Sequence, residues 1–184
     1  MRRKLVSKFG STQLYGGGLS VRTSVDPALQ KIADQALQDG LIYYDSRHGW
    51  RKPIATIDVG PDWDKKLSEI EKPKGMMPEW KLAVVLDVGI NRAKIGLRSG
   101  EIGFIENTNI GWKHEWRKNQ KLGRRLKQLG DFMDRGSVVL VEMVDKHQSL
   151  FKLRQIPQVN GALIALDPHT GRVLAMTEIG RAHV

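Results

Sequence analysis

Residues Ser149-Leu150-Phe151-Lys152 match the S-x-x-K pattern, in which a lysine activates a serine nucleophile for acyl transfer. That chemistry needs both side chains on one face, as residues three apart on a helix provide. Here the pattern falls in the second arm of a predicted β-hairpin, where Ser149 and Lys152 project to opposite faces. The chain contains no S-x-N sequence, and its nearest approach to K-T-G is the turn at 169–171. We therefore predict no catalytic residue, and a serine hydrolase built on Ser149 is the least favoured function.

The sequence also predicts neither a metal site nor a cofactor. His114-Glu115 begins like the zinc motif H-E-x-x-H, but Lys118 stands where the second histidine would be, and an ammonium group cannot replace an imidazole ligand at neutral pH. The five histidines are scattered, and the absence of cysteine excludes disulfides and thiolate ligands. The glycines at 16–18 lack the G-x-G-x-x-G and G-K-[ST] patterns of phosphate-binding loops.

A basic segment between residues 111 and 130 is the strongest candidate for binding. It holds seven of the cations in a chain of net charge +10, against one acid, Glu115, and two tryptophans are interleaved with them. Cations beside aromatic platforms are how small barrels bind extended polymers. The alternative is a solvated loop or helix whose cations only keep the protein soluble. The predicted contacts to a polyanion, a glycan or a partner protein are Trp112, Lys113, Trp116, Arg117, Lys118, Lys121, Arg124, Arg125 and Lys127.

The N-terminal third predicts a strand followed by a helix. Residues 19–25 alternate between apolar and polar side chains, which is typical of a strand. Asp26 and Pro27 then supply an N-cap and a first helical residue, and apolar residues at helical spacing follow. We therefore expect a helix over 27–40, ended by Gly40, and a second, short helix beginning near Pro61.

From residue 80 onward the pattern changes to short strands. A strand over 80–88 precedes a hairpin that turns at Ser99-Gly100. Two more hairpins are predicted, one over 136–157 and one over 161–176 that turns at 167–171. Several short strands at close spacing predict a small barrel or sandwich. No apolar run approaches the roughly 20 residues of a membrane helix, and no apolar segment follows the basic start as in a signal peptide, so a soluble chain is expected.

Three stretches carry longer patterns that occur together in one family. They are YGGGLSVRTSVDPALQKIADQAL at 15–37, YYDSRHGWRKP at 43–53 and VNGALIALDPHTGRVLAM at 159–176. In this order they resemble the class A (bifunctional) penicillin-binding proteins of the 1A type. The second stretch departs from the family at Lys52, where a glycine is usual.

The resemblance implies a domain organisation and a fold. Residues 1–55 would be a linker and the N-terminal edge of the transpeptidase domain, 56–157 an OB-like β-barrel, and 158–184 the first hairpin of the transpeptidase domain. The implied fold is mainly β with α (α+β): a small OB-like barrel inserted in a segment made of a strand, a helix and a C-terminal hairpin. Residues 177–184 depart from the family's glycine-rich continuation, and we expect them to be partly non-native.

The resemblance also implies a function. The family's glycosyltransferase glutamates would lie upstream and its transpeptidase serine and lysine downstream, so the chain is expected to be an internal, non-catalytic module of a periplasmic peptidoglycan synthase anchored in the inner membrane. Its expected partners are glycan strands or a regulatory cell-wall protein, and the rest of the synthase. Membrane contact is expected only through an absent N-terminal anchor, and no nucleic acid is expected. The alternative is a free-standing OB-type protein that binds single-stranded nucleic acid.

The hairpin at 161–177 predicts a further interaction. In the family it would lie beside a larger sheet, and without that sheet it has an open edge and an uncovered apolar face. We expect it either to form a homodimer contact or to fold back against the helix at 27–40.

Overall fold

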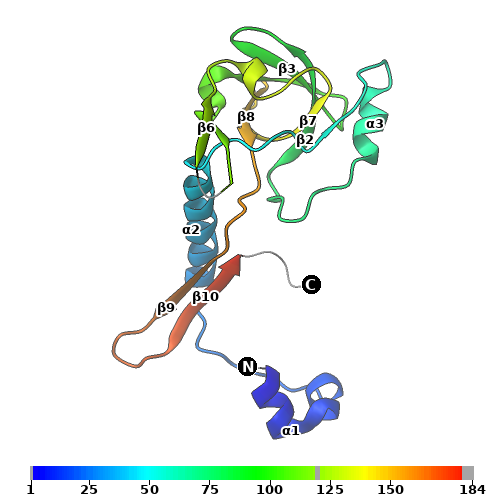
Figure 1. The fold of residues 1–184 in the computed structure, drawn as a ribbon. Coiled ribbons are helices and arrows are strands. Elements are labelled where there is room, and N and C mark those ends of the chain that lie inside the picture. The colour runs from blue at the N-terminus through cyan, green and yellow to red at the C-terminus, as the bar shows by residue number, and fades with distance from the viewer. Residues whose placement is uncertain (1, 119–120, 180–184) are drawn as a thin grey trace. The chain divides into compact units, whose positions relative to one another are not determined.

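The computed structural model describes residues 2–118 and 121–179 (Figure 1). These residues form two compact units. One unit combines the N-terminal residues through Asp34 with Leu163–Thr177, and the other is built from Gln35–Ala162. The boundaries fall inside helix α2 (Pro27–Ser46) and strand β9 (Gly161–Leu166), so each of these elements contributes to both units.

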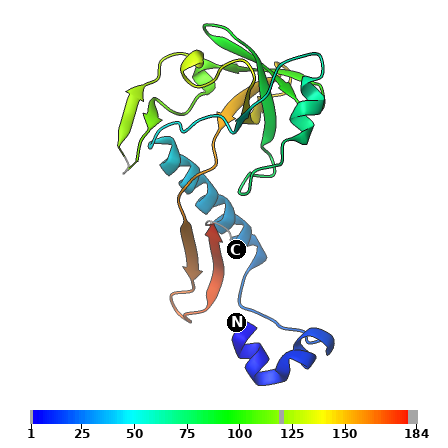
Figure 2. The same ribbon diagram turned by 45° about the vertical axis from the view of Figure 1, so that its right-hand side comes forward.

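The larger unit is a closed barrel of five strands (Figure 2). Its strand order is β7-β2-β3-β4-β8, and β8 pairs again with β7 to close the barrel. All pairs are antiparallel except β4 with β8. This is the Greek-key arrangement of an OB fold, so the predicted α+β class with an OB-like barrel is confirmed. The strands are β2 (Lys81–Val88), β3 (Arg92–Leu97), β4 (Ile102–Glu106), β7 (Ser137–Asp145) and β8 (Leu150–Arg154), and the short β1 (Ala55–Thr56) pairs with β7.

Two hydrophobic clusters cover both faces of β2 and β7. One fills the barrel and includes Val85, Val139 and Phe151. The other lies outside the barrel, where Val84 and Val138 pack with residues of α3 (Trp63–Glu69). Because both faces are buried, these strands read as continuous apolar runs rather than as alternating ones.

A buried polar network ties the end of α2 to the exit of the barrel. The guanidinium of Arg51 donates to both carboxylate oxygens of Asp45, at 2.7 and 3.1 Å, and Asp45 is only 3% exposed. The side chain of Gln155 donates to Asp45 at 2.8 Å and to the carbonyl of Gly49 at 3.1 Å. Its own oxygen accepts the backbone N–H of Arg51 at 2.7 Å. The chain segments that enter and leave the barrel are therefore held side by side.

Helix α2 begins as predicted but continues past Gly40. Asp26 accepts the backbone N–H groups of Ala28 and Leu29, which confirms the N-cap. The helix continues to Ser46 because Leu41 is buried and Ile42 packs on the outer barrel cluster. This packing outweighs the cost of about 1 kcal/mol that a glycine carries inside a helix.

The smaller unit corrects one prediction. Residues 19–25 form no strand, although Ser24 donates its hydroxyl to Val173 and Asp26 donates its N–H to Leu174. The alternating pattern marks an extended segment, but these isolated bonds to β10 (Val173–Ile179) do not build a ladder. Helix α1 (Arg2–Gly16), with a non-helical Gly10, was not predicted.

The C-terminal hairpin of β9 and β10 turns at Asp167–Gly171 as predicted, where Gly171 donates its N–H to the carbonyl of Asp167. The side-chain amide of Gln30 both accepts from and donates to the backbone of Met176, at 3.1 Å each. The hairpin therefore contacts the first turn of α2, which is one of the two expected outcomes. Ile164, Leu166 and Met176 are more than half exposed. In the part of the chain that the structure describes, no helix is both long and apolar enough to cross a bilayer.

We predict that Asp45→Ala lowers the free energy of unfolding by about 3–5 kcal/mol, because it leaves Arg51 and Gln155 without their buried acceptor. Urea unfolding followed by tryptophan fluorescence would measure this loss. Asp62→Ala is the matched control, since the Asp62–Lys66 pair is an exposed one, and exposed pairs contribute little. A loss for Asp45→Ala no larger than that of the control would contradict the role given to the network.

Candidate functional site

The described part of the basic segment, residues 111–118 and 121–130, contains a β-hairpin that projects from one side of the barrel (Figure 2). Its strands are β5 (His114–Trp116) and β6 (Leu122–Arg125). His114 lies opposite Arg125, and Trp116 lies opposite Leu122. The described residues thus form a regular element, here called the basic hairpin, where the alternative expected a solvated loop or helix.

Trp50 anchors the basic hairpin to the end of α2. Its N–H donates to the carbonyl of His114 at 2.8 Å, and its carbonyl accepts from Trp116 at 2.9 Å. Gly49 makes this approach feasible, because its φ is +97° and a Cβ there would lie 2.7 Å from the backbone nitrogen of Trp116. The Y-D-S-R-H-G-W-R stretch therefore shapes the base of the hairpin.

Trp112 lies inside the barrel and not on the binding surface. It is 6% exposed, and its ring centroid is 5.1 Å from that of Trp50. The indole N–H of Trp50 donates to the carbonyl of Phe132 at 3.0 Å, whereas the indole N–H of Trp112 has no partner among the described residues. This placement corrects the expectation for Trp112. Trp116 is half-buried, so the hairpin offers less aromatic surface than its sequence suggests.

Asp131 fixes the other end of the hairpin. One of its carboxylate oxygens accepts the backbone N–H groups of Lys127 and Gln128, at 2.8 and 3.2 Å. Arg124 pairs with its other oxygen at 3.1 Å. The pKa of Asp131 lies below its ordinary value. The largest cause is the hydrogen bond from Lys127, followed by the one from Gln128 and by the nearby guanidinium of Arg124. Arg124 therefore helps to hold the hairpin in place and is less available to bind a partner than the other cations.

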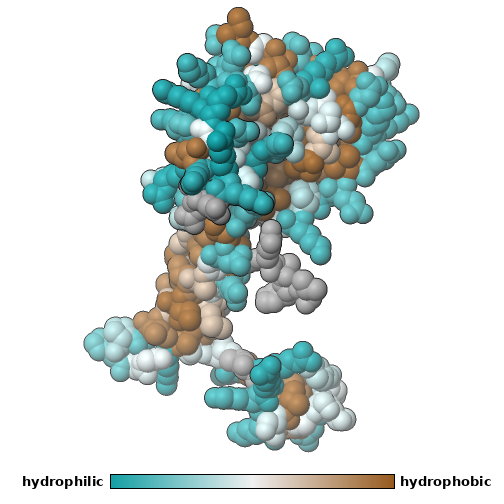
Figure 3. Space-filling model, viewed as in Figure 1, coloured by the Kyte–Doolittle hydropathy of each residue, from teal (hydrophilic) through white to brown (hydrophobic). Residues whose placement is uncertain are grey.

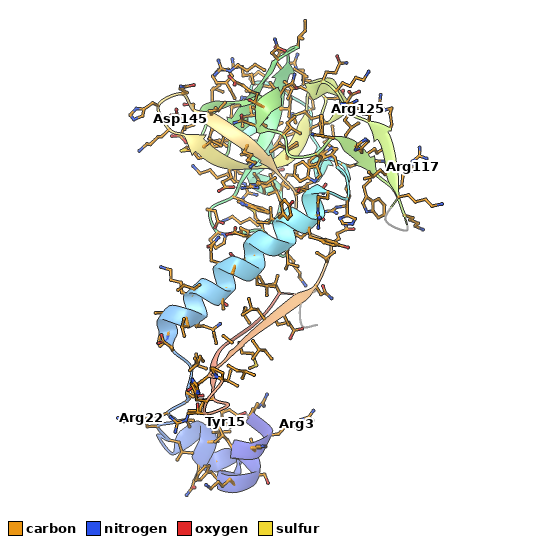
Figure 4. All side chains as sticks on the ribbon, turned by 90° about the vertical axis from the view of Figure 1, so that its left-hand side faces the viewer. Arg3, Tyr15, Arg22, Arg117, Arg125 and Asp145 are labelled. Atoms are coloured by element: carbon orange, nitrogen blue, oxygen red, sulfur yellow. The ribbon has the colours of Figure 1, made fainter. Side chains whose placement is uncertain are left out.

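The remaining predicted cations are exposed. Figure 3 shows hydrophilic residues gathered over this side of the barrel, and Figure 4 shows Arg117 and Arg125 on the side opposite Asp145. In the part of the chain that the structure describes, none of these cations has an ion-pair partner. They are Lys113, Arg117, Lys118, Lys121, Arg125 and Lys127.

Two hollows flank the hairpin and differ in charge. One, of about 310 Å³, is lined by cationic, imidazole and apolar side chains without any acid: Ser46, Arg47, Gly49, Gly111, Lys113, His114 and Leu122. The other, of about 250 Å³, mixes Glu115, Asp131 and Asp134 with three cations. Of these two, only the first, here called the basic hollow, has cations and no acid in its lining. Sequence reasoning missed Arg47 and His114, although both lie beside motifs that were noted.

The two S-x-x-K residues lie in different local structures. Ser149 lies in the turn before β8, with a φ of 49°, and its carbonyl accepts the N–H of Phe104 at 2.9 Å. Lys152 follows inside β8, and the structure records no hydrogen bond between the two side chains. No group of three or more potential metal ligands occurs among residues 2–118 and 121–179.

Comparisons with known proteins agree on one family. The family model described as "Penicillin-binding protein OB-like domain" matches residues 50–159. Penicillin-binding protein 1A of Rickettsia typhi is 40% identical over 176 residues, which are 95% of this chain and 21% of that protein. Penicillin-binding protein 1A of Vibrio cholerae is 29% identical over 95% of this chain and 22% of its own length. The chain thus spans about a fifth of the length of the curated relatives it matches.

A solved structure shares the fold. The crystal structure of penicillin-binding protein 1A from Haemophilus influenzae matches with a TM-score of 0.62 at 24% identity. The match covers 96% of this chain and 24% of that one.

We predict that Gly49→Ala destabilises the protein by about 1–3 kcal/mol through backbone strain, and that the clash with Trp116 adds to this. Hydrogen exchange at the Trp116 amide should accelerate, because its bond to Trp50 opens. Gly100→Ala is the control for strain alone, since φ is +81° there and no atom lies within 4 Å of the added Cβ. Equal losses in the two variants would contradict a specific contact at Gly49.

Because the pKa of Asp131 is lowered in the folded protein, its contribution to stability should depend on pH. A depressed folded pKa contributes stability that is fully present above the unfolded pKa, about 4, and is lost as the pH falls through the folded value. Asp131→Asn should therefore be less stable than the parent at pH 6, and the difference should shrink below about pH 4. Thermal unfolding across this range would measure it, and a difference independent of pH would contradict it.

Proposed function

Because the chain belongs to the family of penicillin-binding protein OB-like domains, we propose that it is a non-catalytic module inside a bifunctional peptidoglycan synthase. The whole protein would polymerise lipid-linked disaccharide-peptides with one domain and crosslink stem peptides through a serine acyl-enzyme with another. It would be anchored in the inner membrane and face the periplasm. The names of the relatives, penicillin-binding protein 1A, support this assignment.

One observation carries the proposal. The family model covers residues 50–159. The buried network of Asp45, Arg51 and Gln155 joins the chain near the two ends of this range. A domain inserted into another must begin and end at neighbouring points on its surface. The network provides such a junction, because the incoming Arg51 and the outgoing Gln155 are hydrogen-bonded to each other.

The junction suggests what the module does mechanically. Gln155 of the outgoing segment is hydrogen-bonded to Asp45, Gly49 and Arg51 of the incoming one, so the two segments cannot separate without leaving these buried polar groups unpaired. The barrel would therefore act as a fixed spacer and not as a flexible linker. Glycan strands or a regulatory cell-wall protein are the partners we propose for such a spacer. The relatives give no support to the nucleic-acid-binding alternative.

A fluorescent penicillin tests this assignment. We expect a covalent adduct with the full-length synthase that is unchanged by Ser149→Ala, and no adduct with the 184-residue chain, because Ser149 has no activating base. Denaturing gels would score both proteins. A one-to-one adduct on the chain that disappears in Ser149→Ala, or a full-length protein that never reacts, would overturn it.

A further inference from the structure

We propose that the basic hairpin and the basic hollow form a docking surface for an anionic lipid bilayer, with lipid phosphates in the hollow. The inference concerns this chain alone and does not depend on the proposed function.

Charge is the first argument. Two cations, Arg47 and Lys113, line the hollow, and no acid is among its lining residues. Arg117, Lys118 and Lys121 add exposed positive charge along the hairpin, and no ion pair within the described residues neutralises them. An uncompensated cluster of this kind attracts a surface of anionic headgroups, at about 1 kcal/mol for each cation near it.

The apolar rim is the second argument. Leu122 lines the same hollow and is 51% exposed, and Trp116, opposite it in the hairpin, is half-buried. Cations around an exposed aliphatic side chain and an aromatic one are the composition of elements that lie in the membrane interface. A bilayer offers phosphate and hydrocarbon within one side-chain length of each other.

The lack of open aromatic rings on the hairpin favours a bilayer over polymers that bind by stacking. Stacking of bases on aromatic side chains needs open ring faces. Trp112 is buried in the barrel, and Trp116 is only partly accessible, so no row of platforms exists along the hairpin. Binding must therefore come mainly from charge, which favours a dense array of phosphates over a largely neutral glycan backbone.

Rigidity is the final argument. Trp50 holds β5 by two backbone hydrogen bonds, and Asp131 caps the return from β6. The cations at the hairpin base are therefore presented at fixed positions, and docking orders less of the chain than binding by a loop would.

Vesicle co-sedimentation tests the proposal with the complete 184-residue chain. We expect binding to vesicles of phosphatidylglycerol and phosphatidylcholine at low salt, little binding to phosphatidylcholine alone, and loss of binding as salt increases. The triple variant Lys113→Glu, Arg117→Glu, Arg125→Glu should bind about a hundredfold more weakly, as the loss of three surface cations implies.

The matched control carries the same change in net charge elsewhere. Lys65→Glu, Lys94→Glu, Lys146→Glu reverses three exposed lysines outside the hairpin, and Figure 4 shows Asp145, the neighbour of Lys146, on the other side of the barrel. This variant should bind at least tenfold more tightly than the hairpin variant. Equal weakening in both would mean that only net charge matters, and would overturn the proposal.

A readout of insertion remains informative if the triple variant fails to fold. The chain has no cysteine, so Leu122→Cys and Lys146→Cys each give a single site for an environment-sensitive dye. We expect a blue shift on anionic vesicles at position 122 and none at position 146. A shift at neither position, or binding to soluble peptidoglycan fragments with no binding to vesicles, would show that a bilayer is not the partner.

Discussion

The barrel depends on one buried ion pair and the glutamine that completes it. Asp45 is almost fully buried, and removing a carboxylate from water costs several kcal/mol unless charge and hydrogen bonds replace the lost solvent. The forked guanidinium of Arg51 and the amide of Gln155 supply both. These three residues come from the end of α2, the entrance of the barrel and its exit. One polar cluster therefore sets where the barrel begins and ends.

The same junction also positions the basic hairpin. Between Asp45 and Arg51 lies Trp50, whose backbone groups hold β5 and whose indole ring joins the barrel core. The preceding Gly49 allows the close approach of the hairpin. The stability of the barrel and the position of the basic hairpin therefore depend on the same few consecutive residues. A change that loosens this stretch acts on barrel closure and on hairpin presentation together, since both use the backbone between α2 and β1.

The hairpin shows how residues of similar composition separate into different roles. Trp112 and Leu126 turn inward and help to fill the barrel, while Arg124 pairs with Asp131. The remaining cations stay in solvent, next to a hollow to which the turn after α2 contributes Arg47. Buried, ion-paired and solvent-exposed side chains thus occur along one short segment. An isolated two-stranded hairpin is marginally stable in water, so some of its neighbouring side chains must pack on the barrel.

Local periodicity, turn residues and charge were enough to predict the barrel strands, their hairpin turns, the N-cap of α2 and the basic character of residues 111–130. The sequence also determined the family, through three ordered stretches. Tertiary contacts, in contrast, were needed to show that residues 19–25 pair in no ladder, that α2 continues past Gly40, and that Trp112 is buried in the barrel. They alone brought Arg47 to Lys113 and His114. The physical reason is the same in each case: pairing partners, burial and electrostatic neighbours come from residues distant in the chain, so no local pattern encodes them.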